Sequence, residues 1–310
     1  MGELHATYWK ALRCPVCGAE MAEDATSGAG VLYCIGAKKH TFDRARSGYV
    51  HLAPRHSGGG DAKEAVRART AFLSAGYYRV AAEGLCDVVG RHLASGLIVD
   101  AGCGEGYYTG ALAASGQGKY ELVGFDLSRD AVDAAARAAR REGVPAHYAV
   151  ASLFELPLAD ESVDAIVNIF APCAEEEFCR VLKPGGLLVL VGAGEKHLLG
   201  LKRALYQTTY DNAERADLPV GMTLCEQVTL RDEIEVEGSE QIAHLFSMTP
   251  YYWRTSFEDK RKLEGLERLQ TEIEFDFKVY RKQYKNSSAA MRAALLFFSH
   301  RLLRRRLRGA

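Results

Sequence analysis

The chain has 310 residues, of which 48% are hydrophobic and 25% charged, a composition typical of a globular protein with one large or two smaller domains. No apolar run reaches the length of a membrane span, and the first residues lack the apolar core of a signal peptide. We therefore expect a cytoplasmic protein without a membrane partner. Its eight cysteines, in a chain of this length without a secretion signal, argue against a disulfide framework.

The formal net charge of −1 conceals two basic segments. Residues 38–69 carry eight basic and three acidic side chains, and residues 281–310 carry nine basic and no acidic ones. Together, on an otherwise acidic body, they indicate a polyanionic partner. Either segment alone is equally consistent with a solvated surface.

The first 56 residues contain a candidate metal site. Cys14 and Cys17 form a Cys-x-x-Cys pair, Cys34 follows after sixteen intervening residues, and His40 after five more. This spacing predicts a structural Zn²⁺ site with three cysteines and one histidine. His51 and His56 are alternatives for the fourth ligand. Because so small a segment buries little apolar surface, the metal should supply its folding energy.

Residues 61–93 follow a glycine-rich turn and have helical composition, with a break at Gly76. Asp61, with Glu64 three residues later, predicts a capping box at the helix start.

From Leu97 to Ala193, strand-like and helix-like segments alternate, which predicts a parallel sheet with helices on both faces. The expected strands are 97–101, 121–128, 146–152, 162–170 and 185–193, and the expected helices are 107–115, 129–142 and 174–182. Further on we expect a helix at 197–210 and strands at 226–236 and 271–284.

A glycine loop joins the first of these strands to its helix. Gly102, Gly104 and Gly106 stand where the backbone must turn sharply and let a ligand approach, but Tyr107 occupies the position of the last glycine in the dinucleotide fingerprint. Asp126 ends the next strand, where a carboxylate accepts both hydroxyls of a ribose. The loop thus predicts a nucleoside cofactor other than a dinucleotide.

The sequences "VDAGCGEG", Asp126 and "RVLKPGG" resemble the class I S-adenosylmethionine-dependent methyltransferases. The resemblance implies an α/β fold, a seven-stranded Rossmann-like sheet whose last strand pair comes from the C-terminal third. It also implies a set of cofactor-binding residues. These are Asp100, Gly102, Gly104, Glu105, Asp126, Ser152 and Leu153.

A longer series of motifs resembles the 23S ribosomal RNA (guanine-N1)-methyltransferases, which carry an N-terminal zinc ribbon. It runs from "CPVC" and "HTFDRARSGYVHL" through "RARTAFLSAGYY", "IFAPC" and "HLLGLK" to "HLFSMTPYYW". The resemblance implies methylation of a guanine in a hairpin of 23S rRNA, and one branch of the family confers macrolide resistance. It also allows a homodimer. Lys38, Lys39, Arg44 and Arg46 are then expected to contact RNA phosphates.

The same resemblance implies further site residues. Tyr78 and His197 should contact S-adenosylmethionine, and Asn168, Phe170 and Pro172 should frame the acceptor base. Family members tend to have a basic residue in place of Asn168 and tyrosine in place of Phe170. Guanine N1 carries a proton that some base must remove. The candidates for that general base are Glu105, Asp160 and His197.

We therefore expect four segments: a zinc-binding RNA-recognition domain at 1–56, a linker and helical segment at 57–96, a methyltransferase domain at 97–282, and a basic C-terminal helix or tail at 283–310. Two other functions compete with RNA methylation. One is a small-molecule methyltransferase, against which the basic head argues; the other is a non-catalytic zinc-dependent RNA-binding protein, against which the intact glycine loop argues.

Overall fold

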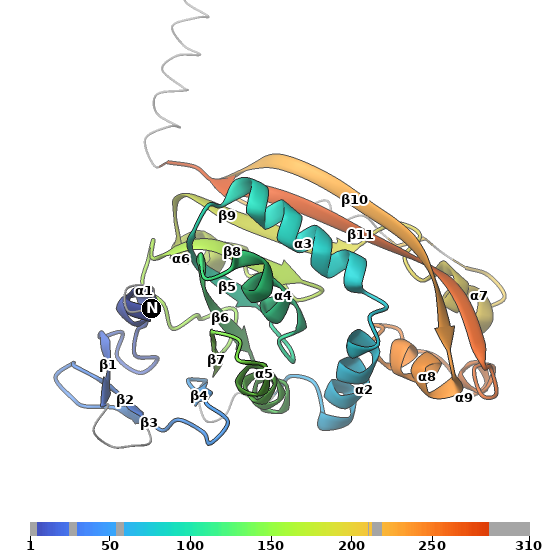
Figure 1. The fold of residues 1–310 in the computed structure, drawn as a ribbon, viewed down its shortest axis with the longest axis horizontal. Coiled ribbons are helices and arrows are strands. Elements are labelled where there is room, and N and C mark those ends of the chain that lie inside the picture. Colours follow the sequence, from blue (N-terminus) through green and yellow to red (C-terminus); the bar gives the residue numbers. More distant parts are fainter. Residues whose placement is uncertain (1–4, 25–29, 54–58, 210, 213–218, 285–310) are drawn as a thin grey trace, which may run out of the picture.

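One large sheet runs through the computed structural model of the protein (Figure 1). The structure describes residues 5–24, 30–53, 59–209, 211–212 and 219–284. In the sheet the strand order is β10-β11-β9-β8-β5-β6-β7-β4. These strands are β4 (Val50–His51), β5 (Gly96–Ala101), β6 (Tyr120–Asp126), β7 (Ala146–Val150), β8 (Val163–Ile169), β9 (Leu182–Ala193), β10 (Met222–Glu237) and β11 (Arg268–Lys282).

The predicted α/β fold class is confirmed. Strands β5 to β9 pair in parallel, and β11 pairs antiparallel with both β9 and β10. One face is covered by α3 (Arg79–His92), α4 (Tyr107–Gly116) and α5 (Arg129–Glu142), and the other carries α6 (Glu175–Val181). Parallel strands put their carboxyl ends at one edge, which we call the carboxyl edge.

The strand number differs from the prediction, since the sheet has eight strands instead of seven. The additional strand, β4, comes from the last residues of the N-terminal head and pairs in parallel with β7, Val50 opposite Ala149. A two-residue strand carries no periodicity of its own, and its partner lies about a hundred residues away, so the sequence pattern does not disclose it.

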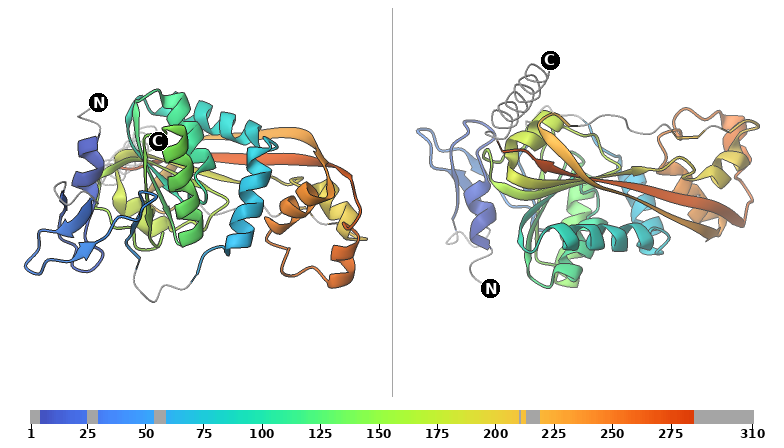
Figure 2. Two further views of the ribbon diagram at one scale, coloured as in Figure 1. Left: turned by 60° about the horizontal axis from the view of Figure 1, so that its bottom comes forward. Right: turned by 90° about the horizontal axis from the view of Figure 1, so that it is seen from above.

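The head packs directly on the sheet. It consists of α1 (His5–Ala11) and a small antiparallel sheet of β1 (Met21–Asp24), β2 (Val31–Cys34) and β3 (Thr41–Phe42). No helix lies between β7 and β8 in this fully described stretch, and α1 covers the face that such a helix would cover (Figures 1 and 2). Leu12 and Leu32 of the head share one buried cluster with Val99, Val123 and Phe125 of the sheet.

The segment after the glycine-rich turn forms two helices, α2 (Lys63–Ser74) and α3, which separate at Gly76, whose φ is +86°. The predicted capping box is wrong. The N-cap is Ala62, without a side-chain hydrogen bond, and Asp61 instead pairs with Arg69, almost two turns into the helix.

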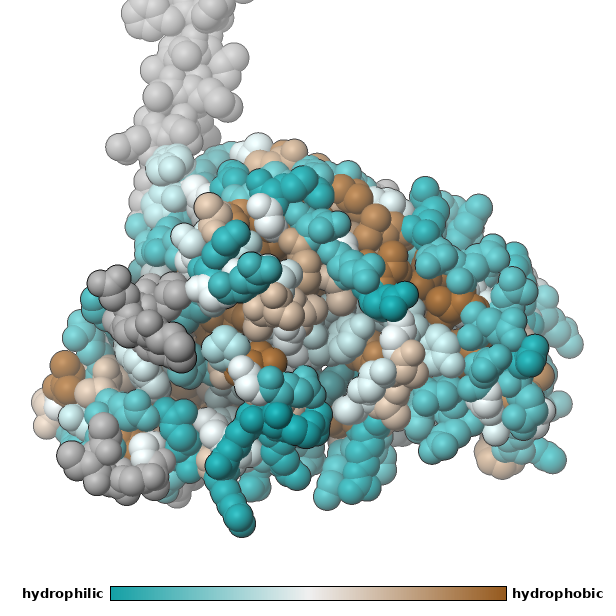
Figure 3. Space-filling view, viewed as in Figure 1, coloured by the Kyte–Doolittle hydropathy of each residue, from teal (hydrophilic) through white to brown (hydrophobic). Residues whose placement is uncertain are grey.

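Strands β10 and β11 form a long arm. Phe275 of β11 lies opposite Ala193, the last residue of β9, so residues 268–274 extend past the carboxyl edge. The connection between the two strands carries α8 (Ser239–Ser247) and α9 (Phe257–Arg261), while α7 (Leu199–Leu205) packs on β11. A hydrophobic band follows the seam between α3 and β10 (Figure 3), where half-buried Val228, Leu230 and Ile234 pack against the core.

None of the helices that the structure describes is long and apolar enough to cross a membrane. The basic tail predicted at 283–310 falls almost entirely outside the described residues, which end at Tyr284.

Candidate active site and metal centre

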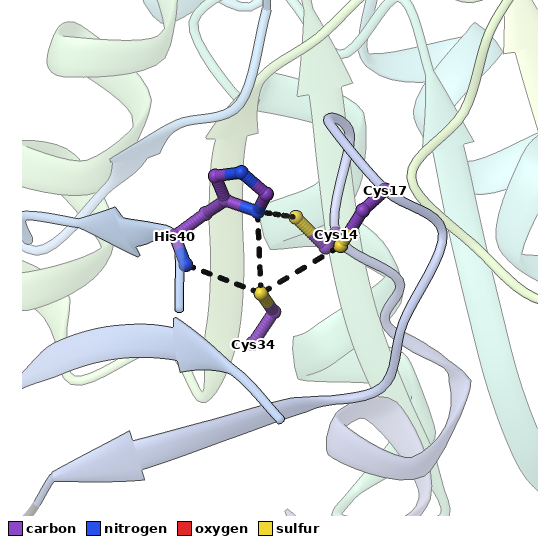
Figure 4. Close-up of side chains that lie close together, drawn as sticks. All are labelled: Cys14, Cys17, Cys34 and His40. Carbon is purple, nitrogen blue, oxygen red and sulfur yellow. Dashed lines mark hydrogen bonds between the residues drawn. The ribbon is translucent and has the colours of Figure 1, made fainter. Parts of the chain in front are cut away.

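The four predicted metal ligands come together between the head's two loops (Figure 4). Cys17 Sγ lies 3.7 Å from Cys34 Sγ, and His40 Nδ1 lies 3.6 Å from Cys14 Sγ and 3.4 Å from Cys34 Sγ. A tetrahedral zinc with bonds of about 2.3 Å to sulfur and about 2.0 Å to nitrogen separates its ligand atoms by about 3.5–3.8 Å. The donor set and its spacing therefore fit a structural Zn²⁺.

A backbone hydrogen bond favours the metal-binding form of Cys34. The N–H of His40 donates to Cys34 Sγ over 3.2 Å, which is the main reason that the pKa of this thiol falls to about 6. A hydrogen bond from the backbone favours the thiolate, the form that binds metal. Of the alternative fourth ligands, His51 is exposed on β4 and outside the cluster, and His56 lies outside the described residues.

The glycine loop and Asp126 meet at the carboxyl edge. Asp126 accepts hydrogen bonds from the backbone N–H groups of Gly104 (3.1 Å) and Ser128 (2.8 Å), one on each oxygen. Each oxygen keeps a lone pair that a ribose hydroxyl could use. Burial raises the pKa of this carboxyl, and the two N–H groups oppose that shift.

Two further acids lie beside the glycine loop. Asp100 is buried and accepts a 2.6 Å bond from Thr109, and burial raises its pKa to about 7. Glu105 is also buried and pairs with Arg69 of α2, Oε2 to Nε, at 2.6 Å. Arg69 lies against Gly104, since a Cβ on that glycine would come within 3.0 Å of the guanidinium.

Tyr78 and His197 form a directed hydrogen-bond chain. The backbone N–H of Glu274 donates to His197 Nδ1 over 3.1 Å, so the ring proton sits on Nε2 and is donated to the Tyr78 hydroxyl, also 3.1 Å away. Burial lowers the pKa of His197 to about 4, which keeps the ring neutral at pH 7. The Tyr78 hydroxyl is left to donate its own proton to a ligand.

The loop after β8 lies over the glycine loop. Asn168, at the end of β8, donates from Nδ2 to the carbonyls of Ala101 and Pro172, which ties this loop to the end of β5. A Cβ on Gly102 would come within 2.4 Å of the Ala171 side chain, so this position needs glycine. Phe170 is 48% exposed, with its ring 5.6 Å from that of His197.

Ser152 and Leu153, which follow β7 after Ala151, complete this edge. Leu153 Cδ1 lies 3.7 Å from the Cβ position of Gly102, and the Ser152 hydroxyl accepts a bond from the N–H of Phe154. The structure thus brings together all the residues expected to bind cofactor and the three expected to frame the base.

The three candidates for the general base differ in their position and in their hydrogen-bond partners. Asp160 precedes β8 at the opposite edge of the sheet and pairs with Arg180, so its assignment to the site is wrong. Both ring nitrogens of His197 are engaged, which leaves it no lone pair for a proton. Glu105 is the candidate that remains at the carboxyl edge.

The four cations expected to meet RNA have different surroundings. Lys38 and Lys39 are exposed beside the metal cluster, whereas Arg44 pairs with Glu23 at 2.8 Å. Arg44 and Arg46 line a cavity of about 500 Å³ between the head and α5, together with Arg140. This cavity opens near the start of β7, away from the carboxyl edge.

Sequence reasoning missed two residues of the site, Arg69 and Tyr108. Arg69 lies on the buried face of α2, three residues after Val66 and three before Phe72. An amphipathic helix is expected to have an apolar side chain at such a position, not a cation. The Tyr108 hydroxyl is buried near Tyr78 and Glu105 and has no hydrogen-bond partner in the described residues. A buried polar group of this kind calls for a ligand.

Comparison with known proteins agrees with both sites. The family model "Methyltransferase domain" matches residues 98–186, and "RlmA, N-terminal", a zinc ribbon, matches residues 12–57. A Micromonospora griseorubida protein named "Putative 23S rRNA (guanine-N(1)-)-methyltransferase" is 34% identical, over 81% of this chain and 90% of its own. The "23S rRNA (guanine(748)-N(1))-methyltransferase" of Streptomyces fradiae is 36% identical, over 63% of this chain and 67% of its own.

The zinc-ligand cluster, the arrangement of the carboxyl edge and these relatives lead to one assignment. The chain belongs to the family of S-adenosylmethionine-dependent 23S rRNA (guanine-N1)-methyltransferases.

Proposed function

We propose that the protein transfers a methyl group from S-adenosylmethionine to N1 of one guanine in a hairpin of 23S rRNA. The observation that carries the proposal is the presence, in one chain, of the carboxyl-edge site and a zinc head, together with sequence similarity to relatives named for this reaction.

The proposed roles at the carboxyl edge follow from its hydrogen-bond directions. Asp126 accepts from the ribose hydroxyls, and the Tyr78 hydroxyl donates to an acceptor on the cofactor, with His197 holding it in that orientation. S-adenosylmethionine, when bound, supplies a methyl group on a positively charged sulfur. The protein's main task is then to position the acceptor base, as Phe170 and the loop held by Asn168 would do.

Proton removal from N1 falls to Glu105 in this scheme. Arg69 donates to Oε2 of Glu105. The carboxylate can therefore take up the N1 proton on its other oxygen, or on Oε2 after the guanidinium has moved away. The substitution Glu105→Gln should lower the rate of methylation much more than the affinity for S-adenosylhomocysteine. Equal losses in both would assign Glu105 to cofactor binding instead.

The zinc head would hold the hairpin. Lys38 and Lys39 offer exposed cations for phosphates, and sequence-specific RNA enzymes act on bases displaced from the stack. We extend the proposal to macrolide sensitivity, because methylation of 23S rRNA in one branch of the family confers resistance. We extend the proposal also to a homodimer, which would leave these roles unchanged.

The test uses rRNA from cells with and without the protein. N1-methylguanine cannot form a Watson–Crick pair, so reverse transcription should stop one position before it in 23S rRNA from cells that have the protein. The stop should vanish in the deletion strain and in a strain with Asp126→Ala, and macrolide susceptibility is measured in the same strains. Identical stops in all strains would refute the proposal.

A further inference from the structure

An aromatic surface lies at the far end of the molecule from the zinc head. Trp253 is 82% exposed and Phe257 is 77% exposed, both in the segment that follows α8. The half-buried Tyr252 supports Trp253, ring to ring at 5.0 Å and 81°, and itself rests on Phe246. We call Tyr252, Trp253 and Phe257 the aromatic platform.

The platform borders the carboxyl edge. It sits on the arm of β10 and β11, which extends past the end of β9, and α8 packs on α2. Two residues before Trp253, Tyr251 points inward, with its ring against Tyr206 and Phe246 and its hydroxyl near that of Tyr78. Residues 251–257 therefore face the carboxyl-edge site with Tyr251 and carry the aromatic platform on their outer side.

The segment is held in this arrangement by local hydrogen bonds. Thr255 Oγ1 donates to the carbonyl of Tyr251 over 2.9 Å and also bonds to the Tyr206 hydroxyl. Ser256 caps α9 by accepting from the N–H of Asp259. The exposed rings are thus presented on a fixed turn, which lowers the entropy lost when a partner binds.

Residues 252–264, which carry the rings, hold four basic and three acidic side chains, and the exposed Glu258 directly follows Phe257. Lys260 Nζ lies 4.3 Å from the centre of the Tyr252 ring, and neither Lys260 nor the exposed Arg254 has an acidic partner in the described residues. Cores of protein–protein interfaces are enriched in aromatic residues but depleted of lysine, whereas aromatic rings beside unpaired cations match the bases and phosphates of single-stranded RNA. The unpaired Lys260 and Arg254, together with the proposed RNA substrate, favour RNA as the occupant over a second copy of the chain.

On the basis of the proposed function, we propose that the aromatic platform stacks unpaired bases that flank the methylated guanine. Head and platform lie at opposite ends of the long axis, with the carboxyl-edge helix α2 between them (Figures 1 and 2). RNA held at both ends would present its intervening loop to the cofactor site. Stacking on Trp253 would offset part of the cost of taking the target base out of its stack.

The two tryptophans of the chain, Trp9 and Trp253, make a direct measurement possible. In a Trp9→Phe background, Trp253 is the only reporter, and addition of unmethylated 23S rRNA transcript should quench its fluorescence. Trp253→Ala should bind the transcript about tenfold more weakly, the loss expected for one stacked base, and Trp253→Phe should recover most of that affinity. Affinity for S-adenosylhomocysteine should be unchanged in both.

Tyr284 provides the matched control, because it is 63% exposed but lies past the end of β11 at the opposite edge of the sheet. Tyr284→Ala should bind RNA like the wild type. Equal RNA affinity of Trp253→Ala and wild type would overturn the platform. So would a dimer, seen by sedimentation, that Trp253→Ala dissociates without loss of RNA affinity. A wild-type protein that binds S-adenosylhomocysteine but no transcript would instead overturn the proposed function.

Discussion

Removal of zinc should unfold more than the head. Leu12 and Leu32 of the head are fully buried in the same cluster as Val99, Val123 and Phe125 of the sheet. If the head lost its metal and detached, these three sheet residues would lose at most the burial of a full apolar side chain each, about 1.5–3 kcal/mol, or up to about 9 kcal/mol together. Whole domains are stable by only about 5–15 kcal/mol, so we expect no stable metal-free transferase.

The assay combines metal content, thermal unfolding and cofactor binding. After treatment with a zinc chelator, far-ultraviolet circular dichroism should show loss of the single cooperative transition, and calorimetry should show loss of S-adenosylhomocysteine binding. Readdition of Zn²⁺ serves as the control and should restore both. Metal-free protein that keeps its unfolding temperature and its cofactor affinity would show that the head contributes nothing to the stability of the sheet.

Three further predictions concern the carboxyl edge and its RNA substrate. Asp126→Ala should weaken S-adenosylhomocysteine binding at least tenfold in calorimetry, because hydrogen bonds to a charged group contribute about 1.5–3 kcal/mol each. The control Asp130→Ala, on the exposed side of α5, should bind normally. Because the pKa of His197 falls from 6.5 to about 4 on folding, the unfolded state binds more protons between these pH values. Stability should therefore fall by up to about 3 kcal/mol as the pH drops through that window, and urea titrations of His197→Gln should show a shallower pH dependence; an unchanged slope contradicts the assignment. Finally, RNA affinity should fall steeply between low and moderate salt while S-adenosylhomocysteine affinity stays constant, and a salt-independent affinity for RNA would favour a small-molecule acceptor.

The sequence pattern predicted most of the sheet because its strands are long and apolar and alternate with helices. The runs that end at Ala101 and Asp126 appear as β5 and β6, with the glycine loop at the expected edge. The metal cluster was equally predictable, because ligand type and spacing alone define a zinc site.

What the sequence pattern missed depends on contacts between distant segments. Asp61 and Glu64 have the spacing of a capping box, yet Asp61 pairs with Arg69, because Glu105 and Gly104 hold that guanidinium next to the helix start. Asp160 was a plausible base by residue type, but only the three-dimensional structure shows that it lies at the wrong edge of the sheet. The local secondary-structure propensity of these residues indicates neither the Asp61–Arg69 ion pair nor the position of Asp160.

The connection between β7 and β8 explains how the head and the chemistry become one unit. Near its start, Ser152 and Leu153 lie beside the glycine loop, where we propose that the cofactor binds, and five residues later Leu158 forms a β-bridge with Leu12 of the head. On either side of that bridge, Arg13 N–H donates to the Pro157 carbonyl and Ala159 N–H to the Ala11 carbonyl, each over 2.8 Å. A head fixed in this way cannot swing freely, so the distance between its exposed lysines and the cofactor site is set by the fold. An enzyme that must deliver one base of a large RNA to one atom benefits from this fixed spacing, because orientation of the acceptor is the main catalytic demand of methyl transfer.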